Sequence, residues 1–424
     1  MKLTQEQQTI LDGKKGETQA KVMETLVRYG ELFGADEMVP ITSKYNHLVT
    51  SFGLKALGAV YSLLDQLIDA GAVSKQEFSA DPRPLDKNVP ANLLEKFVFN
   101  NFMYTKQEEY EKQLEKLGLM NKNAFTCTAY MPEVGNVPNK GDILSWSESS
   151  AVVYANSVLG ARCNRNSGII DIMGSIAGFV PSFGLLKDEG RKATWVVRIE
   201  TSKKPEAQLL GSAIGMKVVE DVPYIIGMDK YLNGKLDDDA KAYLKDFGAA
   251  TASNGAVGLY HVENITPEAV EQGRSLIAEE AREYVIDDAE LKRVYDSYPI
   301  IWKNKDAKPK LCFIGCPHLS MAQLKGWSRD IKKALKANGR RKVAVPTVLT
   351  TAPDVLEAFR NEKEYQDLVN VGVILSYICP LMYMNNPICQ KVPTITSSNK
   401  LRTYTSARYY KDAELLEIIT GGRS

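Results

Sequence analysis

The sequence predicts an α/β protein built from several layers, with largely parallel sheets. Short apolar runs typical of strands alternate with amphipathic stretches typical of helices along most of the chain, which favours strand–helix–strand units. The 424 residues exceed what one hydrophobic core usually holds, so we expect sub-lobes of roughly 1–120, 121–290 and 291–424.

Capping residues and periodicity predict the individual elements. Thr4 and Gln7 have the spacing of a capping box, and the apolar residues that follow up to Val27 keep a helical period. In chain order we expect helices over 4–27, 52–70 and 101–119, strands over 194–200 and 217–228, helices over 237–246 and 267–284, strands over 299–302 and 309–314, and a helix over 321–337.

Composition narrows the class of protein. Lys and Arg total 53 against 52 for Asp and Glu, which gives no electrostatic reason to expect nucleic acid or an anionic membrane as a partner. The apolar runs 169–186 and 371–384 are interrupted by Pro181 and Pro380, so we expect buried strand-and-turn segments and not membrane spans. The N-terminal residues lack the apolar segment of a signal peptide. These features predict a soluble, cytoplasmic protein.

The run from Ser145 to Arg165 is the most informative segment. It interleaves five serines, one carboxylate, two amides and two guanidiniums with apolar residues. Buried polar groups need partners, and this mixture is typical of a pocket wall that is apolar behind and polar in front. Arg162 and Arg165 could form a fork for a carboxylate or a phosphate. The alternative is a helix start rich in capping serines.

Six cysteines occur without any CxxC pair, and in a cytoplasmic chain they are expected to be free thiols or metal ligands. Cys127, Cys316 and Cys379 each follow or end an apolar strand-like run, and two of them precede proline, which forces extended backbone. Three such thiols could hold one iron–sulfur cluster and leave one iron open for substrate. The alternative is that each thiol is a small buried hydrophobe.

Several motifs follow one another along the chain. They are Cys127-Thr128-Ala129-Tyr130, Glu148-Ser149-Ser150-Ala151-Val152, Asn156 to Arg162, Gly255 to His261, Thr266 to Ala269, Gly315-Cys316-Pro317-His318 and Cys379-Pro380. Together they resemble the catalytic domain of the aconitase X family, from residue 3 to about residue 420.

This resemblance implies an aconitase-type α/β/α catalytic domain and a dehydratase whose iron–sulfur cluster acts as a Lewis acid on a substrate hydroxyl. Known members dehydrate cis-3-hydroxy-L-proline or mevalonate 5-phosphate. The chain has no room for a swivel domain, so we expect the large subunit of a heterodimer with a small swivel-domain subunit. In the family, a serine of the swivel part is thought to contribute to catalysis.

The resemblance also implies roles for particular residues. Cluster ligands would be Cys127, Cys316 and Cys379. Catalytic candidates are Glu148, Ser149, Ser150, His261, His318 and Lys400, and substrate-binding candidates are Asn156, Arg162, Asn164, Arg165 and Ser397. A lone histidine is more often a bonded core residue than a catalyst, and Lys400 could be a solvated residue at a helix start. Glu148 would act as acid or base or only orient a neighbour, with a base from the partner subunit as the alternative.

Five positions depart from the family pattern, namely Asp81, Ala129, Cys163, Ser397 and Thr403. They put the substrate in doubt more than the fold. An acidic Asp81 that faced the pocket would repel a substrate phosphate. We therefore expect dehydration of a small hydroxylated carboxylate such as cis-3-hydroxy-L-proline. The alternatives are mevalonate 5-phosphate as substrate and a degenerate, non-catalytic scaffolding subunit.

Overall fold

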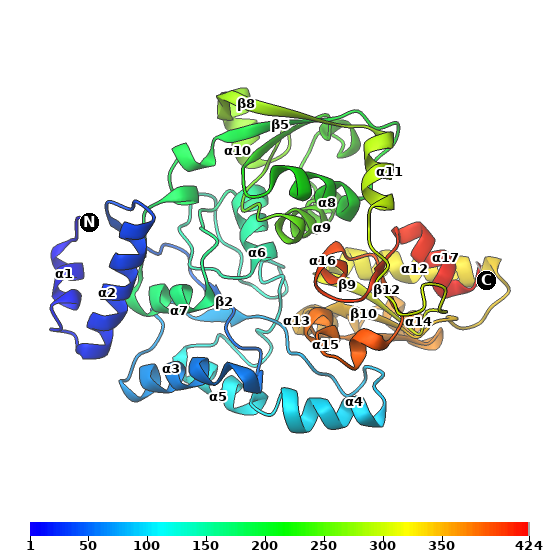
Figure 1. Ribbon diagram of the computed structural model, residues 1–424, viewed down its shortest axis with the longest axis horizontal. Coiled ribbons are helices and arrows are strands. Elements are labelled where there is room, and N and C mark those ends of the chain that lie inside the picture. Colours follow the sequence, from blue (N-terminus) through cyan, green and yellow to red (C-terminus); the bar gives the residue numbers. More distant parts are fainter. Residues whose placement is uncertain (423–424) are drawn as a thin grey trace.

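Two parallel sheets, one within residues 193–286 and one within residues 311–409, organise the structure (Figure 1). The computed structural model describes residues 1–422. In the described part of the chain every pair of strands except one is parallel, and helices surround both sheets. This arrangement confirms the expected α/β class with largely parallel sheets. The sub-lobe boundaries near residues 120 and 290 stay a prediction.

The first part of the chain is mainly helical, with two short two-stranded sheets. The capping box predicted at Thr4 and Gln7 is confirmed, because each side chain bonds the backbone N–H of the other residue. The elements are α1 (Gln5–Leu11), α2 (Glu17–Leu32), β1 (Met38–Pro40), β2 (Asn46–Leu48), η1 (Lys55–Leu57), α3 (Gly58–Asp69), β3 (Phe78–Ala80), α4 (Leu93–Val98), η2 (Phe99–Met103), α5 (Gln107–Leu117), α6 (Ser149–Tyr154), η3 (Ala155–Leu159), α7 (Gly168–Ala177), β4 (Phe179–Pro181), η4 (Gly184–Leu186) and η5 (Glu189–Arg191).

The middle part is a four-stranded parallel sheet in the order β7-β6-β5-β8. Its elements are β5 (Ala193–Ile199), α8 (Ala207–Val218), β6 (Pro223–Ile226), η6 (Asp229–Tyr231), α9 (Asp238–Asn254), β7 (His261–Val262), α10 (Pro267–Gln272), η7 (Gly273–Leu276), β8 (Ile277–Ile286) and α11 (Asp288–Asp296). Helices α8 and α9 pack closely because Gly211 has no side chain; a Cβ there would lie 2.3 Å from the carbonyl oxygen of Phe247.

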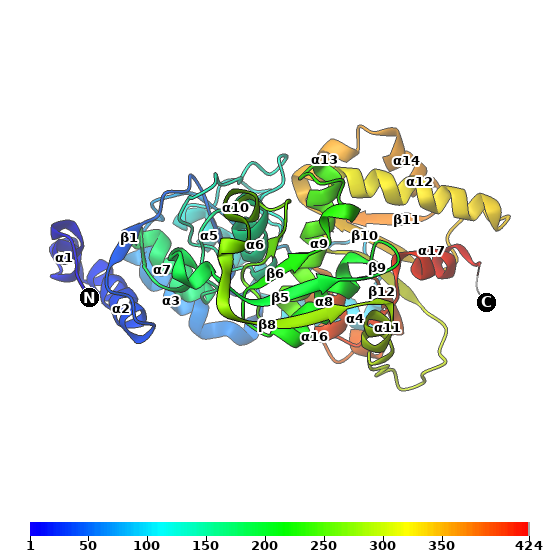
Figure 2. The ribbon, with the colours of Figure 1, turned by 90° about the horizontal axis from the view of Figure 1, so that it is seen from above.

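The last part is a five-stranded parallel sheet in the order β11-β10-β9-β12-β13. Its elements are β9 (Leu311–Leu319), α12 (Met321–Ala337), β10 (Thr347–Thr351), α13 (Pro353–Phe359), α14 (Lys363–Asn370), β11 (Val373–Ser376), α15 (Pro380–Met384), η8 (Cys389–Lys391), β12 (Thr394–Thr396), α16 (Asn399–Tyr404), β13 (Arg408–Tyr409) and α17 (Asp412–Thr420). Figure 2 shows α12 and α14 on one side of this sheet and α16 on the other.

The order of the strands in this last sheet determines where a site can form. The chain adds β10 and β11 on one side of β9 and then returns to add β12 on the other side. The strand order therefore reverses between β9 and β12. In parallel sheets, ligands bind outside the carboxyl ends of the strands at such a reversal.

Some expected elements are wrong. Residues 267–284 begin as helix α10 but continue as strand β8, whose exposed Glu and Arg residues resemble a solvated helix. No strand forms over 299–302. Helix α8 was not expected, because it is buried on nearly all sides and lacks an amphipathic period. The apolar run at 169–186, expected as strand and turn, begins in helix α7 and continues as strand β4 and the short helix η4.

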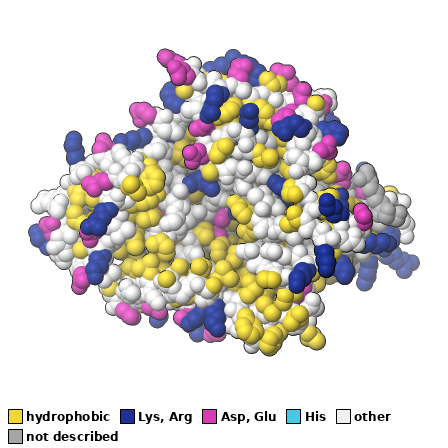
Figure 3. Space-filling view, viewed as in Figure 1, with side chains coloured by type: hydrophobic (Ala, Val, Ile, Leu, Met, Phe, Trp, Pro, Cys, Tyr) yellow, Lys and Arg dark blue, Asp and Glu magenta, His cyan; other side chains and the backbone are white. Residues whose placement is uncertain are grey.

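One face of α4 and η2 carries an apolar patch. Leu93 is 88% exposed and its neighbours Leu94, Phe97 and Phe102 are more than half exposed, and Figure 3 shows hydrophobic side chains gathered over this helix. Single exposed apolar residues are ordinary, whereas a cluster of this kind often marks an interaction surface. No helix within residues 1–422 is long and apolar enough to cross a membrane.

Candidate active site

A small enclosed pocket of about 40 Å³ lies at the reversal point of the last sheet. Cys316 and His318 belong to the carboxyl end of β9. Cys379 is the N-cap residue of α15, which follows β11, and Lys400 lies in the first turn of α16, which follows β12. Because β9, β11 and β12 are parallel, their carboxyl ends bring these four side chains to one edge of the sheet.

The opposite wall of the pocket comes from the first part of the chain. Asp81 directly follows β3, and Cys127 lies in the loop that follows the backbone bridge between this strand and Phe125. Glu148 is the N-cap residue of α6, and its carboxylate accepts hydrogen bonds from the backbone N–H and the hydroxyl of Ser150 at 3.1 and 2.7 Å. The pocket therefore forms only when the first and last parts of the chain are packed together.

The three thiols of Cys127, Cys316 and Cys379 line this pocket and lie close enough to interact electrostatically. Burial raises the pKa of each thiol. Within residues 1–422 no three His, Cys, Asp or Glu side chains are arranged to hold a single metal ion. An iron–sulfur cluster distributes its thiolate ligands over several irons, so three soft donors around one pocket suit a cluster better than a single ion.

The backbone of Cys316 is fixed from two directions. Its carbonyl oxygen accepts hydrogen bonds from the hydroxyl of Ser398 at 2.5 Å and from the amide of Gln208 at 3.2 Å. Gly315 before it has φ +110°, and a Cβ there would lie 2.3 Å from the carbonyl oxygen of Thr350. Only glycine fits this close and left-handed position, so the strand can turn Cys316 toward the pocket.

Lys400 and Glu148 form a buried ion pair inside the pocket. Burial alone would raise the pKa of Glu148, but the charge and hydrogen bond of Lys400 outweigh it and lower this pKa to about 2. Burial favours the neutral amine of Lys400, yet the charge of Glu148 raises the pKa of that ammonium above its usual range. The pocket therefore holds an ionised pair at neutral pH.

Asp81 and His47 leave buried polar atoms without partners beside this pair. Oδ1 of Asp81 and Nε2 of His47 lie 3.7 Å apart, and neither makes a hydrogen bond to a described residue. Burial and the nearby charge of Glu148 raise the pKa of Asp81 well above its usual value, and burial lowers the pKa of His47 to about 4. Unsatisfied buried groups are costly, and their presence at a pocket indicates a place for a bound ligand.

His318 also lines the pocket, but both of its ring nitrogens are hydrogen-bonded within the protein. Burial lowers the pKa of its imidazole to about 4. The side chain is therefore neutral at physiological pH and fully engaged.

Seven predicted site residues do not line the pocket, namely Ser149, Asn156, Arg162, Asn164, Arg165, His261 and Ser397. The amide of Asn156 donates to the carbonyl oxygens of Cys163 and Gly258 and accepts from the N–H of Cys163, and Asn164 holds the backbone of residues 183–185 in the same manner. These two side-chain amides therefore bond backbone groups and stabilise the conformation of the run from Ser145 to Arg165.

Arg162 and His261 are likewise engaged elsewhere. The guanidinium of Arg162 pairs with the exposed Asp188 and donates to a backbone carbonyl oxygen. His261 lies in β7, and its Nε2 is 2.9 Å from the carbonyl oxygen of Arg191. Ser397 lines a separate hollow of about 60 Å³, next to Asp412.

Arg165 differs from these residues. It is an exposed residue that makes no ion pair or hydrogen bond to a described residue, and its charge interacts with Tyr404, Glu148 and Glu220. Its side chain packs over Gly258, where a Cβ would lie 3.2 Å from Cδ of the arginine. An unpaired guanidinium near Glu148 is suited to bind an anion.

Sequence reasoning missed several residues that shape this site, including His47, Gln208 and Ser398. Asp81 stood out as a departure from the family pattern but was not selected as a site residue. Gln208 lies in the unpredicted helix α8, and His47 lies in a three-residue strand, so neither carried a recognisable signal.

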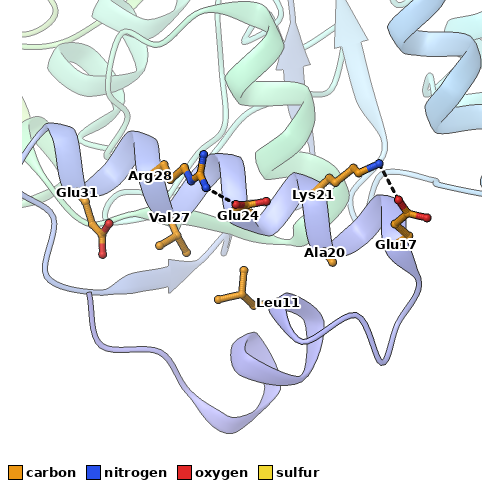
Figure 4. Close-up of a pocket in the computed structure, with 8 residues that line it drawn as sticks. All are labelled: Leu11, Glu17, Ala20, Lys21, Glu24, Val27, Arg28 and Glu31. Atoms are coloured by element: carbon orange, nitrogen blue, oxygen red, sulfur yellow. Dashed lines mark ion pairs between the residues drawn. The ribbon is translucent and has the colours of Figure 1, made fainter.

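A larger hollow of about 520 Å³ lies over α1 and α2 and shares no lining residue with the active-site pocket (Figure 4). Its charged side chains are all paired, Lys21 with Glu17, Arg28 with Glu24, and Glu31 with the N-terminal ammonium, and the remaining lining is aliphatic. It contains neither a thiol nor an unpaired buried group, so its volume alone does not indicate a catalytic site.

Comparisons with known proteins identify the family to which the chain belongs. Models of the first, second and third domains of aconitase X match residues 1–189, 193–296 and 309–418. The phosphomevalonate dehydratase large subunit of Thermococcus kodakarensis is 32% identical over 376 residues, which are 87% of this chain and 86% of that protein. The large subunit of the same name from Methanosarcina mazei is 32% identical over 85% of this chain and 81% of its own length.

A cis-3-hydroxy-L-proline dehydratase of Pseudomonas aeruginosa is 26% identical over 82% of this chain but only 56% of its own length. Among solved structures, the holo-form of aconitase X from Thermococcus kodakaraensis matches with a TM-score of 0.80 and 28% identity, covering 98% of this chain and 99% of that one.

Proposed function

Because the chain belongs to the aconitase X family and is a hydro-lyase of that family, we propose that it is the large subunit of a phosphomevalonate dehydratase. The observation that carries the chemistry is the single pocket in which three thiols meet an ionised Lys400–Glu148 pair. The substrate would be mevalonate 5-phosphate, a hydroxy acid with a phosphate.

Two observations support the phosphorylated substrate over cis-3-hydroxy-L-proline. The chain covers 86% of the Thermococcus kodakarensis large subunit but 56% of the Pseudomonas aeruginosa hydroxyproline enzyme. Repulsion of a phosphate requires a negative charge on Asp81, whereas burial raises the pKa of this carboxyl well above its usual value. A raised pKa weakens the negative charge of Asp81 and therefore its repulsion of a substrate phosphate.

Three thiols around one pocket, that of Cys316 buried and those of Cys127 and Cys379 partly buried, fit an iron–sulfur cluster with these cysteines as ligands. When bound, such a cluster would supply a Lewis acid that makes the substrate hydroxyl a better leaving group. Coordination deprotonates thiols outright, so their raised pKa values do not oppose ligation.

The residues of the chain can do the remaining work of binding and orientation. Arg165 would bind an anionic group of the substrate, and Lys400 would donate a hydrogen bond to the carboxylate or to the departing oxygen. Glu148, with a pKa of about 2, is too weak a base to remove a proton from carbon, so its role is to keep Lys400 charged and in place.

Dehydration breaks a C–O bond and a neighbouring C–H bond, so a base must take the proton from carbon. Among the residues that line the pocket, Lys400 is held as an ammonium by its pair with Glu148, and both ring nitrogens of His318 are bonded within the protein, so neither is suited to this task. We therefore propose that the small subunit, implied by the large-subunit names of the relatives, supplies the base and completes the site.

The first experiment purifies the chain without oxygen, reconstitutes it, and measures iron, sulfide and the visible spectrum. Cys316→Ala should lose the cluster, whereas Cys312→Ala, a buried cysteine four residues earlier in the same strand but outside the pocket, should keep it. Equal iron in both variants would reject the ligand assignment. Absence of iron from the reconstituted wild type would favour the scaffolding alternative.

The second experiment adds a candidate small subunit and compares the two substrates. We expect turnover of mevalonate 5-phosphate and an increase of KM of at least about tenfold in Arg165→Ala, the loss of one charge-assisted contact. Arg162→Ala is the matched control, because this guanidinium is already paired with Asp188. Turnover of cis-3-hydroxy-L-proline alone would reverse the choice of substrate.

A further inference from the structure

His318 connects the three segments that carry the candidate ligand cysteines. It lies two residues after Cys316 in β9, and its ring contacts Thr126 and Ile378, each of which directly precedes one of the other two cysteines. Nδ1 lies 3.0 Å from Oγ1 of Thr126, and Nε2 lies 3.0 Å from the carbonyl oxygen of Ile378. These contacts span 192 and 60 residues of sequence.

The chemistry of the partners fixes the direction of both bonds. A carbonyl oxygen only accepts, so Nε2 of His318 carries the proton and donates a hydrogen bond to the carbonyl oxygen of Ile378. Nδ1 is then the acceptor, and the hydroxyl of Thr126 donates to it. Oγ1 of Thr126 in turn accepts from the backbone N–H of Thr128 at 3.1 Å. The ring is therefore held in one tautomer and one orientation.

The backbone of His318 is bonded as well. Its N–H donates to the sulfur of Cys127 at 3.4 Å, and its carbonyl oxygen accepts from the ammonium of Lys245 at 3.1 Å. Every polar group of this residue thus has a partner within the described part of the chain. No donor or acceptor remains for a substrate.

We propose that His318 is a positioning residue that holds the Cys127 and Cys379 loops at fixed places relative to Cys316. This inference rests on the proposed iron–sulfur site and gives His318 a task other than proton transfer. Loops from distant parts of the chain would otherwise have to be ordered when the cluster binds, and that ordering costs free energy. A brace that exists beforehand keeps the three sulfurs ready for ligation.

The test removes each bond of the brace separately. Thr126→Val deletes the hydroxyl that donates to Nδ1, whereas Thr126→Ser keeps it. His318→Leu deletes both ring bonds, and His318→Gln keeps an amide N–H that can reach the Ile378 carbonyl. Thr347→Val is the matched control, because Thr347 is also fully buried, lies in β10 away from the pocket, and donates its hydroxyl to the carbonyl oxygen of Val345.

Two readouts follow these variants. The first is the rate at which an iron chelator bleaches the reconstituted protein; we expect Thr126→Val and His318→Leu to release iron about 10–100-fold faster than wild type. Thr126→Ser should stay near wild type, and His318→Gln should lie between. The second is amide hydrogen exchange in the metal-free protein, where the brace variants should expose residues 126–130 and 377–382 together and Thr347→Val should not.

Each outcome decides one question. Wild-type rates of bleaching and of exchange in His318→Leu would overturn the brace, as would an equal acceleration in Thr347→Val. A wild type that never takes up iron would count against the proposed function, and the exchange experiment would still decide whether His318 couples the two loops. Exchange that rises in only one loop would show that His318 does not join the three segments.

Discussion

Two buried ion pairs, Lys400–Glu148 in the pocket and Arg191–Glu268 beneath η3, are similar in burial and opposite in bonding. Arg191 forms a bidentate pair with Glu268 at 2.7 and 2.9 Å and also donates to the carbonyl oxygens of Leu185 and Asn156. Lys400 has no described partner except Glu148, and the neighbouring Asp81 has a carboxyl oxygen without any hydrogen bond.

The difference in hydrogen bonding distinguishes a structural ion pair, Arg191–Glu268, from one that is available to a ligand, Lys400–Glu148. A buried pair whose donors are all bonded fixes the packing of the elements around it, and it has nothing left to offer a ligand. A buried pair with spare donors beside a cavity keeps bonding capacity that a substrate can use. Burial alone does not distinguish the two; the count of unmet hydrogen bonds does.

The largest effect is expected in the pocket pair. Lys400→Met should lower kcat/KM by about 10²–10⁴-fold, because it removes the cation that lines the pocket beside Glu148. Its unfolding free energy should fall less than that of an Arg191 variant, since Glu148 keeps two hydrogen bonds from Ser150. Steady-state kinetics with the small subunit and urea unfolding measure the two quantities. A kcat/KM within about threefold of the wild-type value would contradict a functional role for the Lys400–Glu148 pair.

The structural pair should respond in the opposite sense. Arg191→Met leaves Glu268 buried without its partner and should lower the unfolding free energy by about 3–5 kcal/mol. The fraction of protein that remains folded should keep its normal kcat/KM, because neither residue lines the pocket. Denaturation combined with activity per folded molecule checks both statements. A stable but inactive variant would place this pair in the catalytic machinery.

Asp171 is a third case, a buried carboxylate without a cation, whose pKa burial raises to about 7 despite hydrogen bonds from neighbours such as Ser145. Since the folded state holds this proton more tightly than the unfolded state, stability should fall as pH rises from about 4 to 7, by about 1.4 kcal/mol per unit at most. Asp171→Asn should lack this decline. Urea unfolding at pH 5 and pH 8 measures the slopes, and identical slopes would refute the assignment.

The smallest effect is expected at Arg162. Its pair with Asp188 lies at the surface, so Arg162→Ala should change the unfolding free energy by about 1 kcal/mol or less. KM for either substrate should stay at the wild-type value. A raised KM for the phosphorylated substrate would restore the fork of two arginines that the sequence suggested.

The sequence predicted features with a local signature and missed those that need distant partners. Cys316 and Cys379 were selected from strand ends followed by proline, which is visible within a few residues. The pair of Lys400 and Glu148 joins positions 252 residues apart, and no local pattern encodes it. The run from Ser145 to Arg165 correctly indicated buried polar structure, but the amide of Asn156 bonds backbone carbonyl oxygens and not the pocket.

The long separations around His318 have a consequence for synthesis of the protein. Thr126 leaves the ribosome 192 residues before His318, and Ile378 follows after another 60. At about 5–20 residues per second, the segment that carries Cys127 is synthesised on the order of tens of seconds before the segment that carries Cys379. A chain that stops before Cys379 would therefore lack one of the three proposed cluster ligands, and its iron content should be lower than that of the 424-residue chain.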